Sequence, residues 1–118
     1  MKTITLNQAK RLAELGVERK INHGYYWRLS DDKLAWVCVL VIYSEVKHGI
    51  PAYSAEELIK LLRAKEHIQI EIYSHGDGFM FYQEGKEDIY GATLTEALCN
   101  KLIYDLENGI TTIEEVNK

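Results

Sequence analysis

The chain has 118 residues, of which 47% are apolar and 27% are charged, and its formal net charge is −4. This length and apolar content provide for one folded domain, residues 1–118, and exclude an intrinsically disordered chain. The negative charge disfavours nonspecific binding to nucleic acid.

A capped helix is predicted near the start of the chain. Thr5 and Gln8 have the spacing at which each side chain accepts a hydrogen bond from the other residue's backbone N–H. Apolar residues recur on one face of residues 6–15, and Gly16 provides the left-handed end. This opening segment is amphipathic and charged, unlike a secretory signal, so we expect a cytoplasmic protein.

An aromatic strand at Tyr25–Leu29 and a turn at residues 30–33 lead into an uncharged apolar stretch, Leu34–Tyr43. Because this stretch is too short to cross a bilayer as a helix and is rich in β-branched residues, it predicts a strand. A strand that is apolar on both faces must be covered on both, so we expect helices to bury it. The sequence leaves open whether it lies at the centre of one sheet or at a dimer seam.

A second capped helix, over residues 55–64, follows a proline-containing loop. Its expected core residues are Leu58, Ile59, Leu61 and Leu62. Residues 67–74 then alternate apolar and polar side chains, which indicates a half-buried strand. Residues 79–82 return after a glycine-containing connection and complete an antiparallel hairpin, with Phe79 and Phe81 inward.

The third capped helix has the strongest apolar period in the chain, and we expect it to be the main cover of the sheet. It begins after Thr93 and ends at Asn108-Gly109. Its core stripe consists of Leu94, Leu98, Leu102 and Leu106. A short edge strand at Ile89-Tyr90 is expected before it, and one further helical turn at residues 112–116 after it.

Together these elements predict an α+β fold of order α-β-β-α-β-β-α, with an antiparallel sheet of three to five strands packed against two or three helices. Cys38 and Cys99 fall at apolar positions, so we expect both to be reduced core residues. Residues 1–30 carry six Lys and Arg against two Glu, whereas residues 84–118 carry eight Asp and Glu against three Lys. Either the two ends lie near each other or both are simply solvated.

The strongest candidate for chemistry is Glu71, His75 and Asp77, around a predicted hairpin tip. A carboxylate–imidazole–carboxylate cluster would hold a divalent metal or act as a general base, as in a small metal-assisted hydrolase. A solvated turn explains the same residues, because a hairpin tip lacks the wall that an active site needs. We favour the turn, and we predict no catalytic residue, metal or cofactor.

The aromatic residues indicate a binding surface. The predicted outer sheet face carries Tyr26, Arg28, Glu71, Tyr73 and Tyr82. Tyr and Arg concentrate at protein interfaces, although an aromatic sheet with Arg also resembles a platform for single-stranded nucleic acid. The alternative is that these tyrosines pack under a helix or on one another. Since the net charge favours a protein partner, we predict a non-catalytic module that binds a protein or self-associates through this face.

Several segments resemble a widespread class of small phage and prophage proteins of bacteria. They are ITLNQAKRLAELGV, YYW, IPAYSAEELIKLL, IQIEIY and IYGATLTEALCNKLIYDLENG, which together cover nearly the whole chain. The matching motifs are caps and core stripes, so the resemblance brings no catalytic residues, and the apolar strand at residues 34–43 is longer here than in that class. For the tyrosine-bearing face we expect a host or phage protein, or a second copy of the chain, as partner, and since the apolar stretch is too short to span a bilayer we expect no membrane association.

Overall fold

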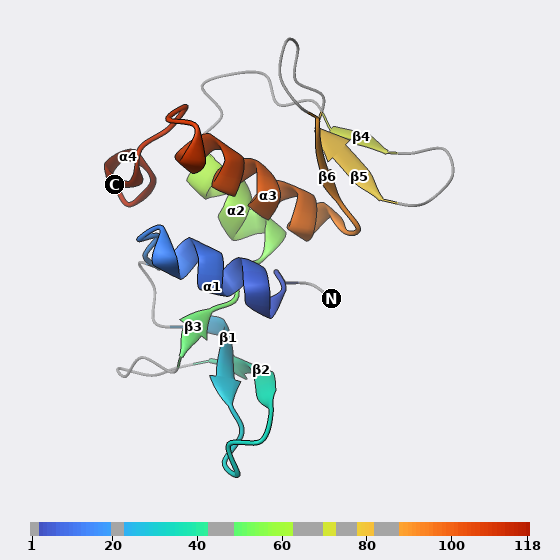
Figure 1. Cartoon of the computed structure of the whole chain (residues 1–118). Coiled ribbons are helices and arrows are strands. Elements are labelled where there is room, and N and C mark those ends of the chain that lie inside the picture. The colour runs from blue at the N-terminus through green and yellow to red at the C-terminus, as the bar shows by residue number, and fades with distance from the viewer. Residues whose placement is uncertain (1–2, 20–22, 43–48, 63–69, 73–77, 82–87) are drawn as a thin grey trace.

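The computed structural model describes residues 3–19, 23–42, 49–62, 70–72, 78–81 and 88–118. Its helices are α1 (Leu6–Glu14), α2 (Ala55–Leu62), α3 (Leu94–Glu107) and α4 (Ile113–Val116) (Figure 1). Its strands are β1 (Gly24–Leu29), β2 (Trp36–Val41), β3 (Ile50–Pro51), β4 (Ile70–Ile72), β5 (Phe79–Phe81) and β6 (Ile89–Gly91). The predicted α+β class is confirmed, and β3 is a strand that the sequence did not indicate.

All three predicted helix caps are present. The hydroxyl of Thr5 accepts from the backbone N–H of Gln8 at 3.2 Å, and that of Thr93 accepts from Glu96 at 3.1 Å. At the start of α2, the hydroxyl of Ser54 accepts from the backbone N–H three residues later at 3.3 Å. Each cap supplies a partner for a backbone N–H that the helix leaves open, which fixes where the helix begins.

The described strands form two antiparallel sheets of three strands each, in the orders β2-β1-β3 and β4-β5-β6. The first predicted hairpin is confirmed, with Leu29 opposite Trp36 and Gly24 opposite Val41. The second is confirmed by the pairing of β4 with β5, and β6 adds the expected short edge strand. The strands that the sequence would place in one sheet are therefore divided between two.

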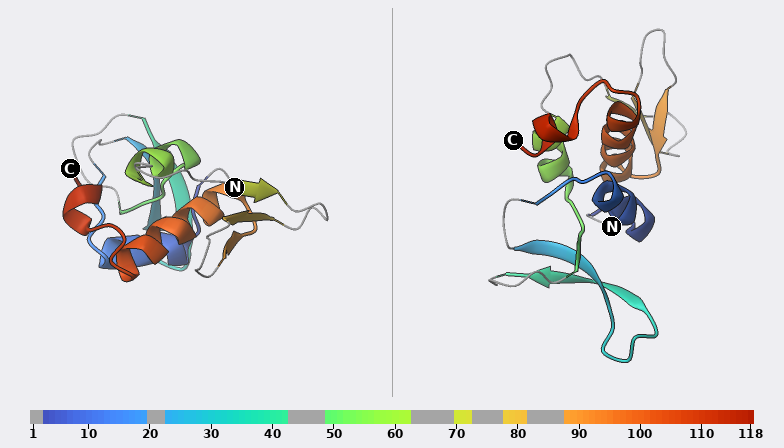
Figure 2. Two further views of the ribbon diagram at one scale, coloured as in Figure 1. Left: turned by 90° about the horizontal axis from the view of Figure 1, so that it is seen from above. Right: turned by 60° about the vertical axis from the view of Figure 1, so that its left-hand side comes forward.

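The helices lie between the two sheets (Figures 1 and 2). Helix α3 packs on β5 and β6 and contacts both other long helices, while α1 contacts β3. The largest fully buried side chains are Ile4, Leu12, Leu58, Phe81, Leu98, Cys99 and Leu102. The core is thus built around α3, as its apolar period predicted, but α3 covers the second sheet and not the sheet that contains β2.

Ile59 and Phe81, both predicted to be core residues, differ widely in exposure. Ile59 was expected in the core but is 55% exposed, because α2 packs on α3 through the neighbouring turn positions and leaves Ile59 on its outer side. Phe81 is buried as expected, and Phe79 is partly buried against the same core.

Gly91 allows α3 to pack directly against β6. A Cβ at this position would lie 2.6 Å from the Cα of Ala97 and 2.8 Å from the carbonyl carbon of Glu96. These are backbone atoms of the first turn of α3, so they cannot move aside without moving the helix. The close approach lets the small side chain of Ala97 complete the contact.

The basic N-terminal segment and the acidic C-terminal segment contact each other through the residues at and after the end of α1, which was one of the two expectations drawn from their opposite charges. The guanidinium of Arg11 lies 3.1 Å from the carboxylate of Glu107. Asn117, directly after α4, donates to the carbonyl of Gly16 at 2.8 Å and accepts from the backbone N–H of Glu18 at 2.9 Å. Within the described ranges, no helix has both the length and the apolar character that a bilayer crossing requires.

Candidate functional site

The residues predicted to form one tyrosine-bearing face are not all on one sheet. Tyr26 and Arg28 are on β1, whereas Glu71 is on β4 of the other sheet. Tyr73 and Tyr82 lie outside the described residues. Arg28 is exposed, but Tyr26 is only 6% exposed. Little tyrosine surface is therefore accessible to solvent in the described part of this face.

Tyr26 is covered by a buried arginine. The guanidinium carbon of Arg19 lies 4.8 Å from the centre of the Tyr26 ring and 5.1 Å from the centre of the Tyr53 ring. The two tyrosines thus enclose the cation from two directions, and the Arg19 side chain is 3% exposed. A cation over aromatic faces is stabilised by their quadrupoles, which adds to the area that the contact buries.

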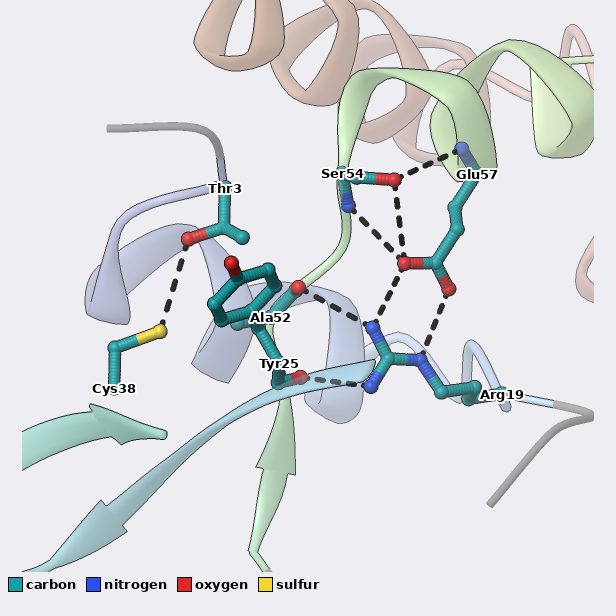
Figure 3. A network of polar contacts seen from close by, with 7 residues as sticks. All are labelled: Thr3, Arg19, Tyr25, Cys38, Ala52, Ser54 and Glu57. Carbon is teal, nitrogen blue, oxygen red and sulfur yellow. Dashed lines mark hydrogen bonds and ion pairs between the residues drawn. The ribbon is translucent and has the colours of Figure 1, made fainter. Parts of the chain in front are cut away.

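The polar atoms of this guanidinium are bonded to three different parts of the chain (Figure 3). Two nitrogens of Arg19 meet the two carboxylate oxygens of Glu57 at 3.0 and 2.9 Å. The third nitrogen, Nη1, donates to the carbonyl of Tyr25 at 2.7 Å, and Nη2, which already donates to Glu57, also donates to the carbonyl of Ala52 at 3.2 Å. Since Glu57 also accepts from the backbone N–H of Ser54, the cluster joins β1, the segment before α2 and the first turn of α2. Its role is structural, and we call it the Arg19 clamp.

The described residues do not include the whole of the alternative hydrolase site, which consists of Glu71, His75 and Asp77. His75 and Asp77 lie outside the described residues, and for Glu71 the structure describes the backbone of β4 only. Among the residues that are described, no three His, Cys, Asp or Glu side chains gather closely enough to hold a metal ion.

Both cysteines are free thiols. Cys99 on α3 is fully buried, and burial raises the pKa of its thiol to about 12, so it stays protonated at neutral pH. Cys38 on β2 is partly buried, and its sulfur lies 3.8 Å from the hydroxyl oxygen of Thr3. The expectation of two buried thiols is therefore met at Cys99 and only in part at Cys38.

The expectation that helices cover the apolar strand on both faces is wrong. Along this segment Leu34 is 85%, Trp36 37%, Leu40 54% and Ile42 80% exposed. The reason is topological, because β2 lies at the outer edge of its sheet and the hairpin of β1 and β2 projects beyond the helices (Figures 1 and 2). We call these four residues the apolar edge.

Among the described residues, the segment before α1 and the helix itself cover the strand in part, at Cys38 and at Trp36. Trp27, opposite Cys38, donates its indole N–H to the carbonyl of Ile4 at 3.1 Å. The ammonium of Lys10 on α1 lies 4.9 Å from the centre of the Trp36 ring. The chain just before α1 therefore covers the strand at Cys38, and the large apolar side chains on either side remain in water.

The backbone of β2 is also open toward the outside of the sheet. Ser30 donates its N–H to the carbonyl of Ala35 at 2.7 Å, which makes that pair a hydrogen-bonded one. Because such pairs alternate along an antiparallel ladder, Val37 and Val39 direct their N–H and C=O groups at β1. The backbone N–H and C=O groups of the alternate residues, Trp36, Cys38 and Leu40, point away from β1. No described strand pairs with that side of β2.

Part of this surface was visible in the sequence. The absence of charge and proline across residues 34–42 is unusual for an exposed edge, since natural edge strands use both to prevent pairing with other chains. What the sequence did not show is that β3 occupies the other side of β1. That strand has two residues, one of them Pro51, and its pattern is that of a loop.

Comparison with known proteins gave no match, neither to a family model nor to a curated protein or a solved structure. The apolar edge is therefore the feature from which a function can be proposed.

Proposed function

We propose that this chain is a non-catalytic protein-binding module whose binding site is the apolar edge. The observation that supports it is the coincidence of exposed Trp36 and Leu40 side chains with outward backbone N–H and C=O groups of the same residues. An edge with both properties offers main-chain hydrogen bonds and apolar area to one partner.

The mode of binding is strand addition. A partner segment in extended conformation pairs with β2 and becomes the fourth strand of the β2-β1-β3 sheet. Its alternate side chains meet Trp36 and Leu40, and the hydrogen bonds provide affinity that does not depend on sequence. Tryptophan is enriched at the energetic centres of interfaces, and Lys10 over the Trp36 ring restricts that ring before binding.

The kind of partner follows the resemblance to phage and prophage proteins. On that basis the partner belongs to the host or to the phage, or is the chain itself. The uncharged character of residues 34–42 favours a protein segment over nucleic acid, because phosphate binding requires Lys and Arg at the contact.

Site-specific photo-crosslinking tests the proposal. A benzophenone amino acid replaces Leu40 in one variant and Ile59 in a control, because the two side chains are equally exposed but Ile59 lies on α2, away from β2. Irradiation in the source cell is expected to give a discrete protein adduct at position 40 and none at position 59.

The result that would overturn the proposal is an absence of adducts at position 40, or the same set of adducts at both positions. The first would mean that the apolar edge has no partner, and the second that contact there is no more specific than at any exposed apolar residue.

A further inference from the structure

We infer that the partner on the apolar edge is a second copy of this chain, paired antiparallel through β2 about a two-fold axis at Cys38. This inference rests on the proposed function and names its partner. The two copies would form one continuous sheet of six strands, from β3 of one copy to β3 of the other.

The outward backbone groups restrict the possible registers. Trp36, Cys38 and Leu40 are the strand residues whose N–H and C=O groups face outward, so an antiparallel copy must pair residues of this set with one another. An axis at Cys38 places Trp36 opposite Leu40 of the other copy. Each of these pairs exchanges two hydrogen bonds, which gives about six between the copies.

The same axis matches the exposed side chains. The residues that flank β2, Leu34 and Ile42, come opposite each other across the copies, so each large exposed apolar residue meets another. Shifting the axis by one residue toward the turn at residues 31–33 brings Ile42 opposite Asp32. Shifting the axis by one residue in the opposite direction pairs Leu40 with Cys38. Leu34 then comes opposite position 44, which lies outside the apolar stretch. The axis at Cys38 is the register in which the edge complements itself.

Charge permits the contact, although the chain as a whole is acidic with a net charge of −4. In a two-fold contact every charge meets its own copy, so a charged strand would repel itself. The segment from Leu34 to Ile42 carries no charge, and the acidic residues of the turn, Asp31 and Asp32, lie at the end of the hairpin, away from the axis.

The exposed apolar area of the edge limits the contact to a modest dimer. From their exposed fractions, the four side chains of the apolar edge leave roughly 500 Å² per copy in water, so both copies together approach the lower bound of about 1,000 Å² for a specific interface. A heterologous partner would need its own matching apolar strand, whereas the second copy already has one.

The first experiment measures mass against concentration on the purified chain by analytical ultracentrifugation. A monomer–dimer equilibrium is expected, and Leu40→Lys should raise the dissociation constant by at least about tenfold, because the introduced charge would face Trp36 in the apolar edge of the other copy. Ile59→Lys is the matched control, since it changes an equally exposed side chain outside the edge and should leave the constant unchanged.

The second experiment locates the contact. Amide exchange at Trp36, Cys38 and Leu40 should slow as concentration rises, while that at Val37 and Val39, already bonded to β1, should not change. A short bis-maleimide should join the dimer through Cys38, with Cys99→Ser retaining the crosslinked product and Cys38→Ser losing it. A dimer in which the amides of Trp36, Cys38 and Leu40 exchange as fast as in the monomer would overturn the axis.

A chain that stays monomeric at millimolar concentration would overturn the second copy as partner, as would a dimer that Leu40→Lys leaves intact. The proposed function can survive either result. If the in-cell adduct at position 40 contains a different protein, binding at the apolar edge stands and self-pairing fails. If that position gives no adduct at all, both fail.

Discussion

The two sheets of this protein are built alike and used differently. Both are antiparallel, and each has three described strands. In one, Phe81 and Ile89 are buried against α3, whereas in the other Trp36 and Leu40 of β2 are exposed. An apolar strand therefore indicates extended structure and does not by itself indicate burial, which depends on whether a helix lies over the strand.

The connections after the strands explain the difference. Two residues after β6 the chain enters α3, and the missing side chain of Gly91 lets the helix lie directly on the sheet that it has just left. The chain that follows β2 returns as β3 and then enters α2, which packs on α3 and leaves β2 without a helix of its own. The apolar content of β2 is thus available to a partner.

The largest contrast is expected between Phe81→Ala and Leu40→Ala. Phe81 is 1% exposed, so its truncation removes buried area and leaves a cavity, at a cost of about 3–5 kcal/mol in the free energy of unfolding. Leu40 already contacts water over about half of its surface, so its truncation should cost less than about 1 kcal/mol.

Urea denaturation measures both values, and it should be done at a concentration at which the chain is monomeric, because association adds to apparent stability. Equal losses for the two variants would show that the hairpin of β1 and β2 is as much a part of the core as β5, and the contrast between the sheets would fail.

A second prediction concerns the Arg19 clamp, which ties the exposed sheet to the helices. Arg19→Met leaves the carboxylate of Glu57 without its ion pair and removes a donor from the carbonyl of Ala52. Because Glu57 keeps some access to water, we expect a loss of about 2–3 kcal/mol, somewhat less than for a fully buried pair. Arg19→Lys retains the charge without the two-pronged geometry and should lose less.

Hydrogen exchange distinguishes this role from a general loss of core packing. In Arg19→Met, amides of β1 should lose protection before those of α3, because the clamp holds β1 to the start of α2. Uniform loss of protection over both elements would place Arg19 in the core itself.

How far the sequence predicts this fold depends on whether the signal is local. The caps at Thr5, Ser54 and Thr93, the leucine stripe of α3 and both hairpins follow from spacing within a few residues, and all are confirmed. The Arg19 clamp joins residues 19 and 57 with two backbone carbonyls, so no short pattern marks it. The outward side of Ile59 depends equally on how α2 is placed on α3.

The candidate site shows the same limit. The apolar stretch from Leu34 to Tyr43 was evident, but its burial was inferred from composition, and its position at the sheet edge is set by the pairing of β1 with β3. The outward tyrosines were inferred from alternation, and Tyr26 is indeed opposite in direction to its neighbours on β1. Tyr26 is nevertheless buried, because Arg19, from the polar segment between α1 and β1, lies over its ring.

A third prediction tests a polar group that the core leaves unsatisfied. The hydroxyl of Tyr53 is buried and has no hydrogen-bond partner in the described part of the chain, and burial raises the pKa of this phenol. Tyr53→Phe keeps the ring over Arg19 and removes the oxygen, so it should raise the free energy of unfolding by about 1 kcal/mol. A decrease in the thermal midpoint would instead show that the hydroxyl has a partner outside the described residues.

A comparison of reactivity uses the two thiols, one in each region. Native protein at pH 8 should react with a disulfide reagent quickly at Cys38, and at Cys99 slower by about 10³-fold or more, because Cys99 reacts only when the core opens. Cys99→Ala and Cys38→Ala assign the two phases. If the slow phase disappears with Cys38→Ala, β2 is the protected strand and the contrast between the two sheets is reversed.

The same burial gives Cys99 a dependence on pH. Its folded pKa of about 12 lies above the ordinary value of 9.0, so below pH 9 the thiol is protonated in both states and its contribution is complete. As pH rises from 9 toward 12, the unfolded chain loses this proton and the folded chain keeps it, so stability falls. Relative to Cys99→Ala, the loss between pH 8 and 9.5 should be less than about 1 kcal/mol, measured by urea denaturation. A stability that stays constant over this range relative to Cys99→Ala would mean that the Cys99 thiol reaches water in the folded chain.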